Sequence, residues 1–196
     1  MLTSVNFRTD GIMQKRVFIT HGYTANSQKH WFPWLKVRLE NEGFSVKVFD
    51  MPEADKPNPA IWLAHHRANI PNVSPQDIFI GHSLGCIATL RFLAQQNRSV
   101  GGLILVAGFD QALPNLPELN DFTAQQPDYA AIIRRIPQRT VIASLDDNVV
   151  NPAFSEQLAA NLQAKYITTQ GYKHFTEHYG VTQLPLVYDE IMTFAR

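Results

Sequence analysis

The chain has 196 residues, 45% apolar and 17% charged, and its 17 basic and 17 acidic side chains cancel. This length and composition predict one globular domain with a substantial core. The balanced charge argues against nucleic acid or an anionic membrane as a partner. One cysteine, Cys86, cannot form an internal disulfide, and no apolar run is long enough to span a membrane. We therefore expect a cytoplasmic protein.

The first twelve residues carry little pattern, and Met13 stands just ahead of the first strand signal. We interpret residues 1–12 as an N-terminal extension, either upstream of the native start or packed on the body as an arm or edge strand. They lack the apolar centre of a signal peptide. Residues 13–196 are expected to form the single domain.

From Val17 onward, short apolar runs alternate with segments of helical periodicity. Runs rich in β-branched and aromatic residues predict strands at 17–20, 44–49, 77–80, 103–106, 140–143 and 166–168. Helical spacing of apolar residues predicts helices at 27–42, 60–70, 83–96, 128–135, 152–163 and 184–194. In the second of these helices, Ile61, Trp62 and His65 are expected to share one face.

This alternation predicts an α/β fold with a parallel sheet of about six strands and helices on both faces. The continuous apolar runs agree with strands that are buried on both sides. In such sheets, binding and catalytic residues gather at the carboxyl ends of the strands.

The third predicted strand ends in Gly-His-Ser-Leu-Gly at residues 81–85, which fits the pattern G-x-S-x-G. Between a strand and a helix, this pattern is typical of a strained turn that exposes a nucleophilic serine. Gly81 and Gly85 leave the space that such a turn needs, and Ser83 becomes the candidate nucleophile. The plainer alternative is a serine that caps a helix and is flanked by glycines.

A serine nucleophile needs a base and an acid, which follow it along the chain in the order acid, then histidine, in α/β-hydrolases. Of the seven histidines, only His174 and His178 lie beyond the fifth predicted strand, and His174 follows the sixth strand in a loop. Asp146 and Asp147 end the fifth strand. The aliphatic Val150 that follows favours Asp147 as the acid, and Asp146 is then a residue that caps the turn.

Two further features are expected around the serine. The oxyanion of an acyl-transfer reaction would accept hydrogen bonds from the backbone N–H groups of Leu84 and Tyr23, and Gly22 permits a close approach. The segment 110–138 has room for one short helix, so we expect little or no cap domain. Four apolar residues in or near this segment are expected to line a shallow substrate pocket: Phe109, Leu113, Leu116 and Phe122.

Taken together, these motifs resemble those of the small serine hydrolases of the YdeN and retinoblastoma-binding protein 9 type, within the α/β-hydrolase superfamily. The resemblance extends over nearly the whole chain from Met13 and is carried by residues 19–23, 30–35, 72–92, 142–147 and 184–189. It matches the acid to Asp147 and the base to His174. Members of the family often have glycine before this histidine, where this chain has Lys173.

The resemblance implies a compact α/β-hydrolase with no large cap and an ester-type hydrolase activity, and it does not supply a substrate. From the candidate residues we expect cleavage of small carboxylic esters or thioesters through an acyl-enzyme intermediate. We expect a small-molecule substrate and no cofactor, and a protein partner stays open.

Two other interpretations remain. Residues 174–178 also match H-x-x-E-H, in which His174, Glu177 and His178 would belong to a zinc hydrolase if a helix presented both histidines on one face. We do not expect a metal, since glycines at 171 and 180 leave only a short helix there.

The second alternative is a binding module without catalysis on a hydrolase fold.

Overall fold

A computed structural model describes residues 14–196, and the predicted extension at residues 1–12 lies outside this range. Six strands alternate with helices along the described chain. The strands are β1 (Arg16–Thr20), β2 (Ser45–Val48), β3 (Asp77–His82), β4 (Gly102–Val106), β5 (Arg139–Ser144) and β6 (Lys165–Thr169). The helices are α1 (Phe32–Asn41), α2 (Pro59–Asn69), α3 (Leu84–Leu93), α4 (Asn120–Thr123), α5 (Tyr129–Arg135), α6 (Pro152–Leu162) and α7 (Pro185–Phe194). Short 3₁₀ turns are η1 (Pro117–Leu119) and η2 (Glu177–Tyr179).

All six strands run parallel in one sheet, in the order β2-β1-β3-β4-β5-β6. The central strands β3 and β4 are buried along their whole length, which explains why their sequences are apolar without alternation. The predicted α/β fold with about six parallel strands and helices on both faces is confirmed. Within the described residues, no helix combines the length and apolar character needed to cross a membrane.

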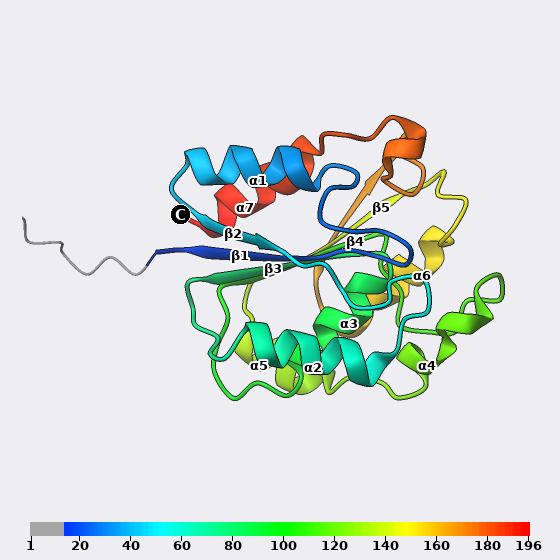
Figure 1. Cartoon of the computed structure of the whole chain (residues 1–196), viewed down its shortest axis with the longest axis horizontal. Helices are drawn as coiled ribbons and strands as arrows, with labels where there is room; N and C mark the ends of the chain where they lie inside the picture. The colour runs from blue at the N-terminus through cyan, green and yellow to red at the C-terminus, as the bar shows by residue number, and fades with distance from the viewer. Residues whose placement is uncertain (1–13) are drawn as a thin grey trace, which may run out of the picture.

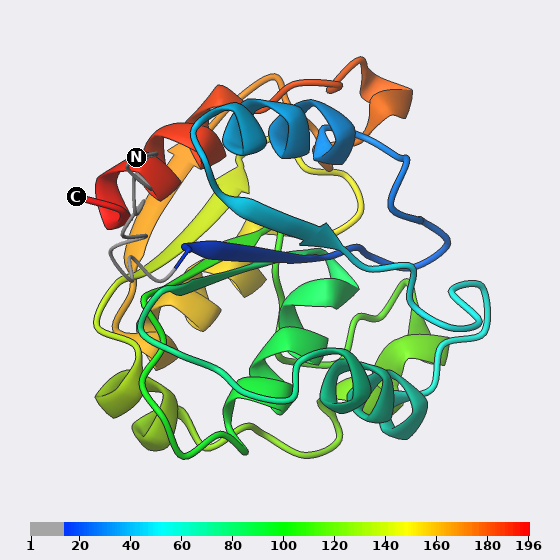
Figure 2. The ribbon, with the colours of Figure 1, turned by 60° about the vertical axis from the view of Figure 1, so that its left-hand side comes forward.

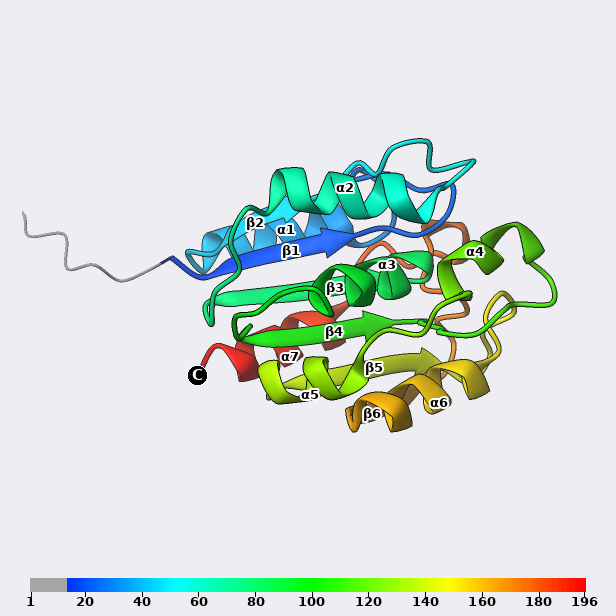
Figure 3. The ribbon, with the colours of Figure 1, turned by 90° about the horizontal axis from the view of Figure 1, so that it is seen from below.

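The helices cover the sheet in two layers, and each layer closes its own core. Helices α1 and α7 lie on one face, and α2, α3, α5 and α6 lie on the other (Figures 1 and 3). Successive side chains of one strand point to opposite faces of the sheet and so belong to different cores. Ile78 and Ile80 of β3 pack with α1 and α7, whereas Phe79 packs with α2 and α3. Figure 2 shows the twisted sheet between these two layers.

Helix α1 begins five residues later than predicted. The segment before it forms turns, because the Asp50 carboxylate accepts hydrogen bonds from the Ser27 N–H and hydroxyl at 2.7 and 3.1 Å. This contact reaches across to the residues after β2, which the local sequence does not reveal. Trp31 is fully buried at the N-cap of α1 and lies outside the helix itself.

The buried face of α2 also differs from the prediction. Trp62 is fully buried as expected, but Ile61 is 43% exposed and His66 takes the place expected for His65. Trp62 and His66 are four residues apart and share one helix face. A hydrogen bond of 3.0 Å between the His66 Nε2 and the Thr20 hydroxyl satisfies one polar atom of this buried histidine.

The connection from β4 to β5 contains only short helices. Besides α5, which lies at the predicted place, it holds η1 with 3 residues and α4 with 4 residues. Neither is long enough to form a separate layer over the strand ends, so the fold has little cap.

Candidate active site

Ser83 lies in the sharp turn between β3 and α3 and is the N-cap of that helix. Its backbone has φ 53° and ψ −122°, a conformation that residues with a side chain rarely adopt. The flanking glycines are needed for packing. A Cβ on Gly81 would lie 2.6 Å from the Cα of Cys86, and one on Gly85 would lie 2.2 Å from the carbonyl oxygen of Thr20. The turn therefore fits tightly against α3 and β1 and presents Ser83 at the carboxyl edge of the sheet.

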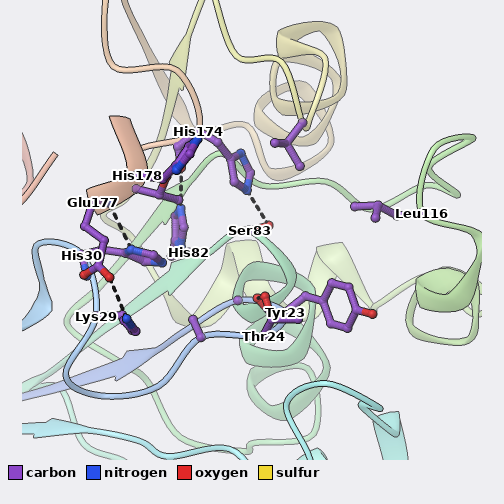
Figure 4. A pocket seen from close by; sticks show the side chains of 14 residues that line it. Tyr23, Thr24, Lys29, His30, His82, Ser83, Leu116, His174, Glu177 and His178 are labelled. Atoms are coloured by element: carbon purple, nitrogen blue, oxygen red, sulfur yellow. Dashed lines mark hydrogen bonds and ion pairs between the residues drawn. The ribbon is translucent and has the colours of Figure 1, made fainter. Parts of the chain in front are cut away.

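Three predicted site residues meet at this edge from three different strand ends. His174, in the loop after β6, has its Nε2 2.9 Å from the Ser83 Oγ and its Nδ1 2.8 Å from an Asp147 carboxylate oxygen (Figure 4). Ser83 and His174 are each 6% exposed. Because the carboxylate accepts from Nδ1–H, Nε2 is free to accept the serine hydroxyl proton. This is the geometry that activates a serine for nucleophilic attack.

The two aspartates after β5 point to different partners. The second carboxylate oxygen of Asp147 accepts hydrogen bonds from the N–H groups of Val149 and Val150 at 2.8 and 3.0 Å, which fix its orientation toward His174. Asp146 instead turns toward the backbone of the loop that carries His174, with the Gly171 N–H 3.0 Å from its carboxylate. The geometry thus places Asp147, and not Asp146, against the imidazole.

The two predicted oxyanion donors lie close to Ser83. A Cβ on Gly22 would be 2.9 Å from the Ser83 Cβ, so the glycine lets the loop after β1 approach the serine. Among residues 14–196, neither the Tyr23 N–H nor the Leu84 N–H has an acceptor within the protein. The Leu84 N–H also belongs to the first turn of α3, where the helix dipole favours negative charge.

Ser83 opens into a cavity of about 370 Å³ with two unlike sides. Apolar atoms of Tyr23 and Leu116 lie on one side of the serine, and Lys29, His30, Glu177 and His178 lie on the other, as labelled in Figure 4. The cavity is therefore suited to a small molecule that carries both an apolar and a polar part.

The predicted apolar pocket is largely wrong. Leu116 lines the cavity, but Phe109, Leu113 and Phe122 are 1 to 2% exposed and belong to the core between the sheet and its helices. The Phe122 ring packs edge-on against Trp62, with ring centroids 5.4 Å apart. These side chains pack in the core beneath the β4–β5 connection and do not line the cavity.

Sequence reasoning missed the polar side of the cavity. The Glu177 carboxylate accepts hydrogen bonds from the Lys29 ammonium at 2.7 Å and the His30 N–H at 3.0 Å. In return, the Glu177 N–H donates to His30 Nδ1 at 3.2 Å. These three contacts, here called the loop clasp, join the segment before α1 to the segment after His174. The residues are 147 or 148 positions apart in the chain, so no local signal connects them.

The H-x-x-E-H match does not form a zinc-binding helix. Residues 174–176 are irregular and the following three form only the 3₁₀ turn η2. His174 is engaged with Ser83 and Asp147, and Glu177 is engaged in the loop clasp. Throughout residues 14–196, no group of three or more His, Cys, Asp or Glu side chains is arranged to hold a metal ion.

The fold and the site together define an α/β-hydrolase. The strand order is that of this fold, and the serine, the aspartate and the histidine follow β3, β5 and β6. The family model described as "Serine hydrolase" matches residues 17–193, and the chain belongs to that family.

The relatives agree with this assignment. The chain is 41% identical to the YdeN protein of Bacillus subtilis (strain 168) over 184 residues, which cover 93% of this chain and 97% of YdeN. The crystal structure of the ydeN gene product superposes with a TM-score of 0.87 and covers 92% of this chain and 98% of that one. Serine hydrolase RBBP9 of Rattus norvegicus is 27% identical over 158 residues, or 79% of this chain and 83% of RBBP9. Est1E of Butyrivibrio proteoclasticus, solved with ferulic acid, shares the fold at 14% identity and a TM-score of 0.70, over 90% of this chain and 89% of that one.

Proposed function

We propose that this serine hydrolase cleaves small carboxylic esters or thioesters through an acyl-enzyme intermediate. The observation that carries the proposal is the continuous hydrogen-bonded series from Asp147 through His174 to Ser83, with contacts of 2.8 and 2.9 Å. Ser83 is the proposed nucleophile, His174 the general base and acid, and Asp147 the residue that orients the imidazole.

In the acylation step, the Ser83 Oγ attacks the carbonyl carbon of the substrate while His174 Nε2 takes the hydroxyl proton. The Asp147 carboxylate holds the proton on Nδ1 and stabilises the imidazolium that forms. The negative charge on the carbonyl oxygen is stabilised by the N–H groups of Tyr23 and Leu84, which have no other acceptor in the described chain.

In the second half of this step, the tetrahedral intermediate collapses and the bond to the leaving oxygen or sulfur breaks. His174 gives its proton to that atom, and the acyl group stays on the Ser83 Oγ. Water then attacks the acyl carbon with His174 as base, and a second collapse releases the carboxylic acid and restores the serine hydroxyl.

The size and lining of the cavity support a small substrate. A volume of about 370 Å³ lies at the lower end of the range for small-molecule sites. The neutral overall charge and the buried, single Cys86 are consistent with the proposed cytoplasmic location and a small-molecule partner.

The test compares wild-type protein with Ser83→Ala on a panel of short esters and thioesters, together with labelling by a fluorophosphonate probe. We expect hydrolysis and labelling by the wild type and loss of both in the variant. A protein that binds the panel compounds without turnover, and resists the probe, would instead be the non-catalytic binding module.

A further inference from the structure

The loop that carries His174 has an unfavourable backbone on both sides of this residue. Lys173 has φ 48° and Phe175 has φ 55°, in the left-handed region that side chains disfavour. Such conformations persist where the surrounding contacts hold them in place. Residues 171–175, here called the base loop, therefore need anchors, because the place of the imidazole depends on this backbone.

One anchor comes from His82, the residue just before Ser83. Its Nε2 lies 2.9 Å from the carbonyl oxygen of His174. A carbonyl can only accept, so Nε2 carries the proton and Nδ1 does not. Burial lowers the pKa of His82 well below its ordinary value, which keeps the ring neutral and in this single donor form.

The ring of His82 is held firmly in its place. It is 2% exposed, with the rings of His30 and Trp31 packed edge-on at centroid distances of 5.4 and 6.1 Å. Its Nδ1 is buried and has no partner in the described part of the chain, so the one hydrogen bond of this side chain goes to His174.

The other anchor comes from Asp146, the residue just before Asp147. One carboxylate oxygen of Asp146 accepts from the N–H groups of Gly171 and Lys173 at 3.0 and 3.3 Å. The Ser144 hydroxyl donates to the same oxygen at 2.5 Å and accepts from the Tyr172 N–H at 3.3 Å. Three consecutive N–H groups of the base loop thus donate hydrogen bonds to Ser144 and Asp146, next to the acid Asp147.

We propose that His82 and Asp146 are positioning residues that hold the base loop from both sides of His174, and so set the imidazole between Ser83 and Asp147. The inference rests on the proposed function, since it explains how its three groups are aligned. Each anchor is next in sequence to a residue that the imidazole contacts: His82 precedes Ser83, and Asp146 precedes Asp147. A shift of β3 or of the β5 turn therefore moves the serine or the acid together with the base.

The first experiment compares His82→Phe with His82→Gln. Phenylalanine fills the same space without a donor, whereas the glutamine amide donates at a similar reach. We expect kcat to fall about 10- to 100-fold in His82→Phe, with KM within about twofold, because small misplacements of a catalytic group have such effects. His82→Gln should recover most of the loss. An equal fall in both variants, or kcat within about twofold of wild type in His82→Phe, overturns the role of His82.

The second experiment compares Asp146→Ala with Asp146→Asn, in which the amide oxygen still accepts the loop N–H groups. We expect kcat to fall about 10-fold in the alanine variant and by less than about threefold in the asparagine variant. Equal effects in the two variants overturn the role of Asp146.

A readout without substrate separates this inference from the proposed function. In the folded protein, the Nδ1–H of His174 bonded to Asp147 should give a protected NMR signal. We expect this signal in the wild type, His82→Gln and Asp146→Asn, and its loss or broadening in His82→Phe and Asp146→Ala. An unchanged signal in all variants overturns positioning. Absent ester turnover in the wild type overturns only the proposed function.

Discussion

The carboxylate that touches His174 is expected to dominate the kinetics among the acidic residues of the site. Asp147→Asn should lower kcat by about 10⁴-fold, because the amide no longer holds the proton on Nδ1 or stabilises the imidazolium. Asp146→Asn serves as the matched comparison, and its kcat should fall by less than about threefold. Steady-state kinetics on one short ester is sufficient. A larger loss in Asp146→Asn than in Asp147→Asn would contradict the assignment of the acid.

Lys173 has, at the scale of one residue, a backbone conformation that favours glycine. Its φ of 48° is unfavourable for lysine, and its ammonium is 3.5 Å from the Asp146 carboxylate at a half-exposed site. Solvent screens such an ion pair, so it adds little to the free energy of unfolding.

The strain can be measured by comparing two variants that both lack this ion pair. Lys173→Gly should be more stable than Lys173→Ala by about 0.5–1 kcal/mol, since relief of the left-handed strain exceeds the entropic cost of glycine. Thermal unfolding should show this as about 2 °C in Tm. A lower Tm for the glycine variant would mean that the base loop is not strained at this position.

The placement of Ser83, Asp147 and His174 could be predicted from the sequence because it follows from order along the chain. Each residue follows the carboxyl end of a strand, and parallel strands bring their carboxyl ends to one edge. The cavity walls could not be predicted in the same way. Leu113 and Phe122 are apolar residues in a connection, and their sequence does not tell whether they face the core or the substrate.

The same difference, between what the local sequence decides and what distant contacts decide, is found in the helices and strands. The strands could be predicted to within about two residues because runs rich in β-branched and aromatic residues, bounded by turn residues, mark them. The predicted start of α1 is wrong because the Asp50 carboxylate, which follows β2, accepts hydrogen bonds from Ser27 and holds this segment in turns. Contacts between distant segments decided these details, as they also decided the polar side of the cavity.

The loop clasp is expected to make stability depend on pH. Burial lowers the pKa of His30 to about 4 from an ordinary value of about 6.5. The folded state therefore prefers the neutral ring, whose Nδ1 accepts the Glu177 N–H. This contribution is complete above pH 6.5 and is lost as the pH falls from 6.5 toward 4.

His30→Asn keeps an acceptor for the Glu177 N–H but cannot titrate. Its Tm should fall less steeply than that of the wild type between pH 7 and pH 5. Lys29→Gln, which weakens the same clasp without removing a histidine, should keep the wild-type slope. The slope will not vanish in His30→Asn, because burial also lowers the pKa of other histidines: His21, His65, His66 and His82. Equal slopes for His30→Asn and wild type would show that the clasp is insensitive to protonation.

At the scale of the whole molecule, the short helices between β4 and β5 leave the strand ends open, which limits the substrates. Long acyl chains find little apolar surface beyond the apolar side of the cavity, and burial of each CH₂ would be worth about 0.8 kcal/mol. We therefore expect kcat/KM to fall as the acyl chain lengthens from about C2–C4 to about C10–C12, without activation at a lipid interface. A rate that rises with each added methylene up to about C10 would reveal an acyl tunnel beneath the strand ends.

The sheet order places the histidine after a strand at the edge of the sheet. Within residues 14–196, strand β6, which leads into the base loop, pairs only with β5 and has no fully buried residue, whereas β3 lies between two strands and is buried throughout. Sheet edges of this kind can open while the central strands stay folded. In a urea titration, activity should therefore disappear before the far-ultraviolet circular dichroism changes. A partly denatured sample would then contain molecules with an intact serine turn and no base, which are inactive although most of their secondary structure remains.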